Sequence, residues 1–235
     1  MFRSVLSRIA TLAVLGFILV GCSSQPGPGL SLGPAPWKDG DRATYDWVNK
    51  SGAKIGTSEL SYSRSGSNWV LTEVDKIGTL DQTAAVTVDG TTLKPLGEQK
   101  TIKSQGTDAT VDTTYQGGKL DIKAVVNGQN KSATLDVPSD SLDNDQIIVT
   151  LRALKFADGY QGSYVNVNGA TATKLNTTVR VVGKESVTVP AGTFDAWKVE
   201  LRFGGQATQY TWYQVDAPNQ LLQYDNGQTK MVLSK

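Results

Sequence analysis

Cys22 is the residue of this sequence whose type and position best define a chemistry. It is the only cysteine in the 235-residue chain, so its thiol has no partner for a disulfide within the chain. A thiolate is a strong nucleophile and is readily modified. Cys22 stands at the end of an uncharged apolar run, and this position indicates a covalent modification.

The first 21 residues have the composition of a signal peptide. Basic residues precede an apolar run over residues 9–21, which is the order found in secretory signals. The run is shorter than the roughly 20 apolar residues that a transmembrane helix needs. Its end, Leu19-Val20-Gly21-Cys22, resembles the lipobox of bacterial lipoproteins. The resemblance implies cleavage between Gly21 and Cys22 and a lipid on the Cys22 thiol. The alternatives are an incidental cysteine at the end of a signal peptide and an uncleaved anchor.

The composition divides the chain into three parts. Residues 1–21 are the expected signal peptide, and residues 22–36 hold the lipidated cysteine and a linker rich in Pro, Gly and Ser. Such a linker predicts a flexible spacer. Residues 37–235 are expected to form a single β-rich domain. We therefore expect an exported protein whose partner is the membrane, at the outer membrane, the cell surface or the periplasmic side.

The composition also excludes several classes of function. The chain has no histidine and a formal net charge of +1. Histidine-dependent catalysis and histidine metal ligation are therefore excluded, and the lack of a dense basic patch disfavours nucleic acid as a partner. We expect no enzymatic activity, no catalytic residues, no metal and no cofactor.

Alternation of apolar and polar residues along the expected domain predicts strands with one buried face. Dipeptides that favour two-residue hairpin turns interrupt the alternation: Asp89-Gly90, Gly117-Gly118, Asn127-Gly128, Asn168-Gly169 and Asn226-Gly227. The predicted fold class is mostly β. We expect about ten or more antiparallel strands in a strongly curled sheet, either a half-barrel or a sandwich.

One short helix is predicted near residues 141–156. Asp143 and Asp145 suit the first turn of a helix, and Ile147, Leu151 and Leu154 would share one face. The alternative is a strand through residues 147–149.

Residues 187–194, Val-Thr-Val-Pro-Ala-Gly-Thr-Phe, predict a hairpin in which Pro190 and Gly192 suit the turn. Beyond it the apolar residues change parity, which predicts a β-bulge near Ala196. The segment 187–200 resembles a signature of secreted bacterial β domains catalogued as a domain-of-unknown-function family. That family is similar in architecture to lipoprotein-carrier folds, in which a curled sheet wraps a helix and leaves an apolar groove. No catalytic residues come with the resemblance.

Acidic residues were the other candidates for chemistry. Asp140, Asp143 and Asp145 lack the spacing of a calcium-binding EF-hand loop, and the start of a helix accounts for them better. A glycosidase needs a pair of carboxylates, but most of the candidates fall at polar positions of alternating strands, which predicts a solvated sheet face. These candidates are Glu59, Glu73, Asp75, Glu98, Glu185 and Glu200.

Three functional hypotheses follow. The first is a lipid-anchored, non-enzymatic module of the cell envelope that binds a lipid or another apolar ligand in a groove lined by Trp197, Tyr210 and Trp212, although aromatic residues in strands more often fill the core. The second is a structural lipoprotein that docks an envelope protein. The third is a hydrolase without histidine.

Overall fold

Fifteen strands and one short helical segment make up the part of the chain that the computed structural model describes, residues 28–205 and 207–234. The strands before the helical segment are β1 Arg42–Asn49, β2 Lys54–Ser65, β3 Asn68–Ile77, β4 Leu80–Val88, β5 Pro95–Ser104, β6 Thr107–Gln116, β7 Lys119–Val126, β8 Gln129–Asp136 and β9 Ser141–Asp143. The helical segment comprises 3-10 helix η1 Asn144–Gln146, α1 Ile147–Thr150 and 3-10 helix η2 Leu151–Ala153. The strands after it are β10 Gln161–Asn168, β11 Thr173–Val189, β12 Gly192–Phe203, β13 Ala207–Gln214, β14 Leu221–Asp225 and β15 Thr229–Leu233.

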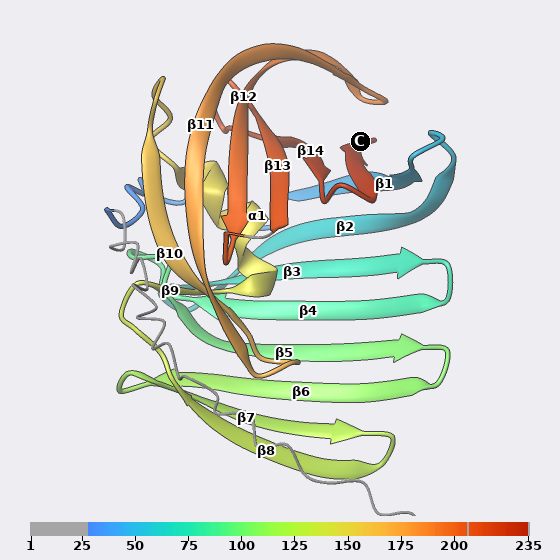
Figure 1. The fold of residues 1–235 in the computed structure, drawn as a ribbon, viewed down its shortest axis with the longest axis vertical. Coiled ribbons are helices and arrows are strands. Elements are labelled where there is room, and N and C mark those ends of the chain that lie inside the picture. The colour runs from blue at the N-terminus through green and yellow to red at the C-terminus, as the bar shows by residue number, and fades with distance from the viewer. Residues whose placement is uncertain (1–27, 206, 235) are drawn as a thin grey trace, which may run out of the picture.

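All strands belong to one sheet, in the order β8-β7-β6-β5-β4-β3-β2-β1-β15-β14-β13-β12-β11-β10-β9. Neighbouring strands are antiparallel except β9 and β10, which are parallel. Within the described residues the edge strands β8 and β9 do not pair with each other, so the sheet is open. Figure 1 shows β2–β8 as one broad layer, with β11–β13 crossing in front of it. The predicted curled, mostly antiparallel sheet is confirmed.

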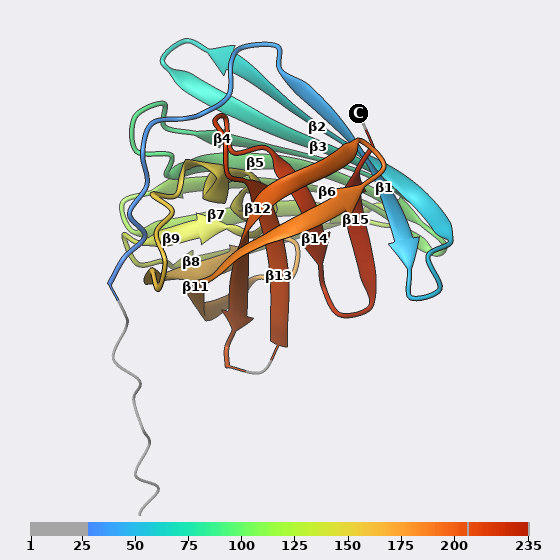
Figure 2. The same ribbon diagram turned by 90° about the horizontal axis from the view of Figure 1, so that it is seen from above.

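The helical segment lies inside the curl, between these two parts of the sheet (Figures 1 and 2). Its start is fixed by a capping box. The Asp143 side chain accepts a hydrogen bond from the Asp145 backbone N–H, and the Gln146 side chain accepts one from the Asp143 backbone N–H. The prediction of one short helix is confirmed, but its start at residue 141 is wrong. Residues 141–143 pair with β10 instead. The alternative of a strand through 147–149 is also wrong.

Local turn chemistry explains much of the meander. Asn127 and Gly128 have φ of 50° and 78°, the left-handed conformations that a two-residue hairpin turn requires. The hairpin over residues 187–194 also forms, with Val189 opposite Gly192. The expected bulge near Ala196 lies instead on the neighbouring strand, between Val181 and Gly183.

Two hydrophobic clusters fill the curl. The larger one joins β1–β4 and β11–β15 to the helical segment and includes the predicted apolar face of that segment, Ile147, Leu151 and Leu154. The smaller one lies against β6–β8 and consists of Val111, Leu120, Ile122, Val137 and Val167. Each cluster buries the alternate residues that the period-two pattern assigns to the inner face.

The segment before the first strand is docked on the domain. The Ser163 N–H donates to the Pro28 carbonyl oxygen at 2.8 Å, and the Gly33 N–H donates to the Ala153 carbonyl oxygen at 2.7 Å. The prediction of a flexible spacer over 22–36 is therefore wrong for residues 28–36. The signal peptide, Cys22 and its proposed cleavage site lie outside the described residues. No helix in the described ranges has the length and apolar character needed to cross a membrane.

Candidate functional site

Buried polar residues interrupt the inner face of the sheet between the two hydrophobic clusters. The register places Val86, Glu98, Thr113 and Ile122 side by side on β4, β5, β6 and β7. Val86 belongs to the larger cluster and Ile122 to the smaller one, so Glu98 and Thr113 lie between them. A buried carboxyl in such a position is costly unless it is paired or protonated, which makes this region the candidate site.

Half of the acidic residues that were expected on a solvated face are buried. Glu98 is 3% exposed, and Asp75 and Glu200 are buried too, whereas Glu59 and Glu185 have side chains 42% and 43% exposed. The solvated-face prediction is therefore wrong for Glu98, Asp75 and Glu200.

A sequence signal for part of this site was present on β3. Trp69 and Leu71 are buried, and Glu73 and Asp75 continue the same alternation. In a strand, residues of one parity share one face. The two acidic residues therefore point into the curl, as the two apolar ones do.

Asp75 is held by a chain of hydrogen bonds. The Trp47 indole Nε1 donates to Ser58 Oγ at 2.6 Å, and Ser58 Oγ donates in turn to Asp75 Oδ1. Gln82 Nε2 donates to Asp75 Oδ2 at 3.2 Å. Burial raises the pKa of Asp75, although the donors Ser58 and Trp47 act in the opposite direction.

Glu73 lies two residues before Asp75 on the same face. Burial raises the pKa of Glu73 well above its usual value, and the charge of Asp75 adds to this effect. Two carboxyls so close together in a buried place tend to hold a shared proton.

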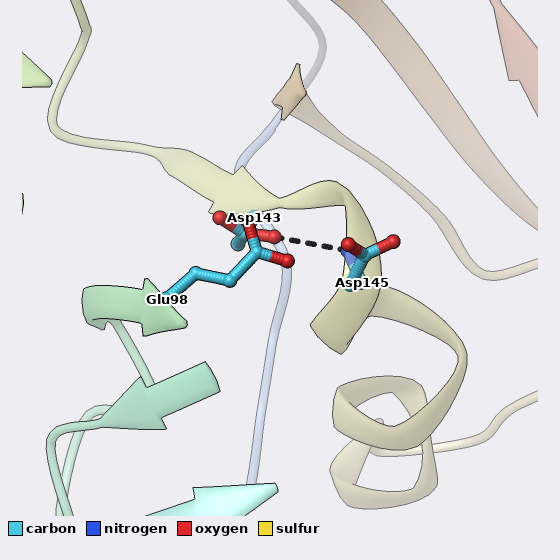
Figure 3. Close-up of side chains that lie close together, drawn as sticks. All are labelled: Glu98, Asp143 and Asp145. Carbon is cyan, nitrogen blue, oxygen red and sulfur yellow. Dashed lines mark hydrogen bonds between the residues drawn. The ribbon is translucent and has the colours of Figure 1, made fainter. Parts of the chain in front are cut away.

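A second group of carboxyls meets where β5 faces the end of β9 and η1. Figure 3 shows Glu98, Asp143 and Asp145 converging, with carboxylate oxygens within 4.8 Å of one another. Lys100 Nζ donates to Asp145 Oδ2 at 2.5 Å, and Tyr115 Oη donates to Asp143 Oδ2 at 2.8 Å. The predicted role of Asp143 at a helix start is confirmed, but the same residue also belongs to this carboxyl cluster.

Burial and neighbouring charges shift the pKa values of these three carboxyls in different directions. Burial raises the pKa of Glu98 to about 10, and the Asp145 carboxyl acts in the same direction. Burial also raises the pKa of Asp143 to about 7, with the charge of Asp145 adding to it. At Asp145 burial is outweighed by the Glu98 carboxyl and the Lys100 ammonium, so the pKa of Asp145 is lowered. In the structure as described, Glu98 is therefore the neutral member of the cluster.

A cleft with a volume of about 410 Å³ opens beside this polar region. We call it the acidic cleft, because Glu73, Asp75 and Asp145 line it and no Lys or Arg stands among its described lining residues. Its other lining residues are amides, aromatic or apolar residues, and two small ones: Gln82, Asn144, Asn166, Asn168, Gln209, Trp47, Phe203, Tyr224, Ile147, Ile148, Leu175, Thr173 and Ala207. Asn166 is 4% exposed, and its Oδ1 has no hydrogen-bond partner among the described residues.

The three aromatic residues expected to line a groove do not lie together. Trp197 pairs with Tyr213 across β12 and β13, while Trp212 pairs with Lys198. Successive residues of a strand point to opposite faces, so Tyr210 and Trp212 lie on the face opposite to Trp197. Trp197 itself is covered by the Phe156 ring, stacked at 5.9 Å. The described residues thus provide no groove shared by this trio.

The sequence of residues 42–232 matches DUF3108, a family of proteins of unknown function. The chain belongs to the DUF3108 family. This confirms the resemblance to an uncharacterised family of β domains. A comparison with curated proteins gave no match.

Solved structures similar to this DUF3108 domain come from other bacterial proteins. A β-barrel-like protein of the DUF1849 family from Brucella abortus has a TM-score of 0.53 at 13% identity and covers 83% of this chain and 95% of its own. An exported protein with a YmcC-like fold from Bacteroides fragilis has a TM-score of 0.33 at 11% identity, over 88% of this chain and 98% of its own. A lipoprotein from Parabacteroides distasonis has a TM-score of 0.33 at 12% identity, with the same coverage. The Brucella likeness concerns the fold alone.

Proposed function

We propose that this DUF3108 protein is a non-enzymatic binding module of the cell envelope, and that its acidic cleft binds a small organic amine. Export and a lipid on Cys22 would tether it to a membrane, at the outer membrane, the cell surface or the periplasmic side. The observation that carries the ligand class is the lining of the cleft, where Glu73, Asp75 and Asp145 face a space with no basic side chain among the described residues.

The other lining residues favour an ammonium group joined to an apolar or planar part. The unpartnered Asn166 Oδ1 is a hydrogen-bond acceptor, and an ammonium supplies donors only. Trp47, Phe203 and Tyr224 supply aromatic surface, which suits the apolar part and attracts a cation to its ring faces. An acyl chain in the same place would take water away from the lining carboxyls without supplying a hydrogen-bond donor or a positive charge, so the amine replaces the apolar ligand of the sequence hypothesis.

Two features support binding rather than catalysis. Glycosidases place two carboxyls on either side of the bond that they cleave, whereas Glu73 and Asp75 project from one strand on one face. The sequence also offers no histidine as a general base near neutral pH. The cleft therefore has the means to attract a cation, and the carboxyl pair lacks the arrangement of a glycosidase.

The shared proton of Glu73 and Asp75 gives the binding reaction a signature. An ammonium group that enters the cleft favours the ionised form of both carboxyls and displaces the proton. Binding should therefore release protons. The affinity should rise as pH increases through the raised pKa of Glu73, as long as the amine stays protonated.

Isothermal titration calorimetry with three probes of similar shape tests the proposal. We expect 2-phenylethylamine to bind, with an apparent enthalpy that changes with the ionisation enthalpy of the buffer. The neutral 2-phenylethanol and the anionic phenylacetate should not bind. Equal binding of all three, or no binding of the amine, would overturn the proposal and make docking of an envelope protein the better hypothesis.

A matched pair of variants locates the binding. Glu73→Gln keeps the shape of the side chain and removes its capacity for charge, so the fold should be unaffected. It should weaken amine binding by about tenfold, equivalent to one charge-assisted hydrogen bond, and should reduce the proton release. Glu59→Gln, on the opposite face of neighbouring β2, should leave both unchanged. If Glu73→Gln bound the amine as tightly as the wild type does, the amine would not bind in the acidic cleft.

A further inference from the structure

The carboxyl cluster of Glu98, Asp143 and Asp145 is separate from most of the acidic cleft. Only Asp145 lines the cleft, and the other two side chains are buried behind it. The three come from two segments, β5 and the turn from β9 into η1, which the fold brings together (Figure 3). Their converging oxygens, within 4.8 Å of one another, span a space that one ion could occupy.

One oxygen of this cluster has no partner. Glu98 Oε1 is buried and accepts no hydrogen bond from any described residue, and the side chain is aimed at the two aspartates (Figure 3). A buried carboxyl oxygen without a partner costs roughly 1–3 kcal/mol. The feature therefore points to a group that the described residues do not supply.

The aspartates are positioned by their surroundings and keep capacity to bind. Asp143 accepts hydrogen bonds from Tyr115 Oη and from the Asp145 N–H. Asp145 accepts from Lys100 Nζ and from Asn144 Nδ2. Each ionised carboxylate oxygen has two lone pairs, so one acceptor position per oxygen is left. The donors orient the two carboxylates without saturating them.

Charge balance indicates what is missing. A cation that displaced the Glu98 proton would leave three ionised carboxylates facing the single ammonium of Lys100, which is an excess of two negative charges in a buried place. A divalent cation matches this excess. The donors are all oxygens, which suits hard ions such as Ca²⁺ and Mg²⁺. Because Mg²⁺ keeps several of its waters and Ca²⁺ accepts bidentate carboxylates, a cluster this buried suits Ca²⁺ better.

We propose that Glu98, Asp143 and Asp145 form a calcium site, reached from the acidic cleft past Asp145. Lys100 stays beside Asp145 as the second positive charge. The sequence analysis expected no metal, because Asp140, Asp143 and Asp145 lack an EF-hand pattern. Glu98, which completes the cluster, lies far from Asp143 and Asp145 in the chain. The site does not depend on amine binding, since Glu73 and Asp75 take no part in it.

Terbium luminescence on the purified protein tests the site. Tb³⁺ takes the place of Ca²⁺, and Tyr115, whose hydroxyl contacts Asp143, lies close enough to sensitise it. We expect saturable emission that Ca²⁺ displaces and Mg²⁺ displaces poorly, together with a rise in the unfolding temperature on adding Ca²⁺. Absence of saturable emission and of stabilisation by Ca²⁺ would overturn the proposal, and preference for Mg²⁺ would overturn the choice of ion.

Three variants separate this site from nonspecific binding. Glu98→Gln removes one ligand charge and should weaken Ca²⁺ binding by about tenfold or more, while circular dichroism confirms the fold. Tyr115→Phe should reduce the Tb³⁺ emission and keep the Ca²⁺-dependent rise in unfolding temperature. Asp81→Asn, at an exposed position of β4, should change neither. Binding by Glu98→Gln as tight as that of the wild type would refute the site.

Discussion

Tyr213 Oη donates a hydrogen bond to the Ile148 carbonyl oxygen at 2.8 Å. The bond joins β13, on one side of the curl, to the helix inside it. Carbonyls near the end of a helix have no partner within the helix, and α1 is only four residues long. Tyr213, whose side chain is fully buried, therefore supplies a donor to an acceptor that the short helix cannot satisfy itself.

Removing this hydroxyl should destabilise the fold. Tyr213→Phe leaves the Ile148 carbonyl without its donor, and we expect a loss of about 1–3 kcal/mol in the free energy of unfolding. Urea denaturation measures it. Tyr224→Phe is the control, because Tyr224 Oη bonds to the side chain of Gln209 at the cleft, which water can reach. Equal losses in the two variants would contradict this role of Tyr213.

Arg152 should be irreplaceable by lysine. The residue is 2% exposed. Its guanidinium donates to the carbonyls of Pro218 and Asn219 and lies 5.2 Å from the Tyr62 ring centroid. A lysine ammonium can reproduce neither the fork of donors nor the stacking. We expect Arg152→Lys to lower the free energy of unfolding by about 2–3 kcal/mol.

The control for Arg152 is an arginine on the surface. Arg64 is exposed, lies over the Trp69 ring at 3.7 Å from its centroid and donates to the Ser67 carbonyl. Arg64→Lys should change the free energy of unfolding by less than about 0.5 kcal/mol. If chemical denaturation gives the same stability for Arg152→Lys and the wild type, the buried contacts of Arg152 are not stabilising.

Glu200 should make the stability depend on pH. Burial opposes ionisation there, but Arg180 at 3.3 Å and Arg202 at 2.9 Å outweigh it and lower the pKa of Glu200. A carboxyl whose pKa is lower in the folded than in the unfolded state stabilises the fold above its unfolded pKa of about 4.3. That contribution is lost as pH falls through the folded value.

Denaturation of Glu200→Gln and the wild type across pH measures this effect. The wild type should be the more stable at neutral pH, and the difference should shrink as the medium becomes more acidic than the unfolded pKa. Glu59→Gln, whose side chain is well exposed, should show little difference at any pH. A gap between Glu200→Gln and wild type that persists in acid would point to packing rather than charge.

Cys22 should carry the lipid. In a bacterial expression host, labelling with a palmitate analogue should mark the wild type and not Cys22→Ser, and Cys22→Ser should leave the membrane fraction. Ser23→Ala, next to the site, should be labelled normally. A Cys22→Ser protein that is still labelled would show that another residue is acylated.

Local patterns were sufficient for much of the fold. The Asn127-Gly128 turn could be predicted because positive φ is required within two residues, and alternation assigned the buried faces of the strands. The start of the helix could not be predicted from local patterns, because Leu142 and Asp143 pair with β10. That pairing depends on the strand register of a distant segment, which no local pattern contains.

The candidate site was predictable only on β3. Glu73 and Asp75 share parity with Trp69 and Leu71, so their burial could have been inferred from the strand alone. Glu98 meets Asp143 only because the sheet curls and brings β5 against the end of β9. A carboxyl cluster assembled from such distant segments has no signature in spacing.

The docked segment 28–36 limits the distance between the domain and a lipid on Cys22. A fully extended chain spans about 3.5 Å per residue, so from Cys22 to Pro28 the reach is about 20 Å, whereas an undocked linker over 22–36 would reach about 50 Å. Pro28 is attached at β10, so in a protein acylated on Cys22 this edge of the sheet would stay within about 20 Å of the bilayer. The domain of such a protein would reach less far toward a partner in another membrane than an undocked linker would allow.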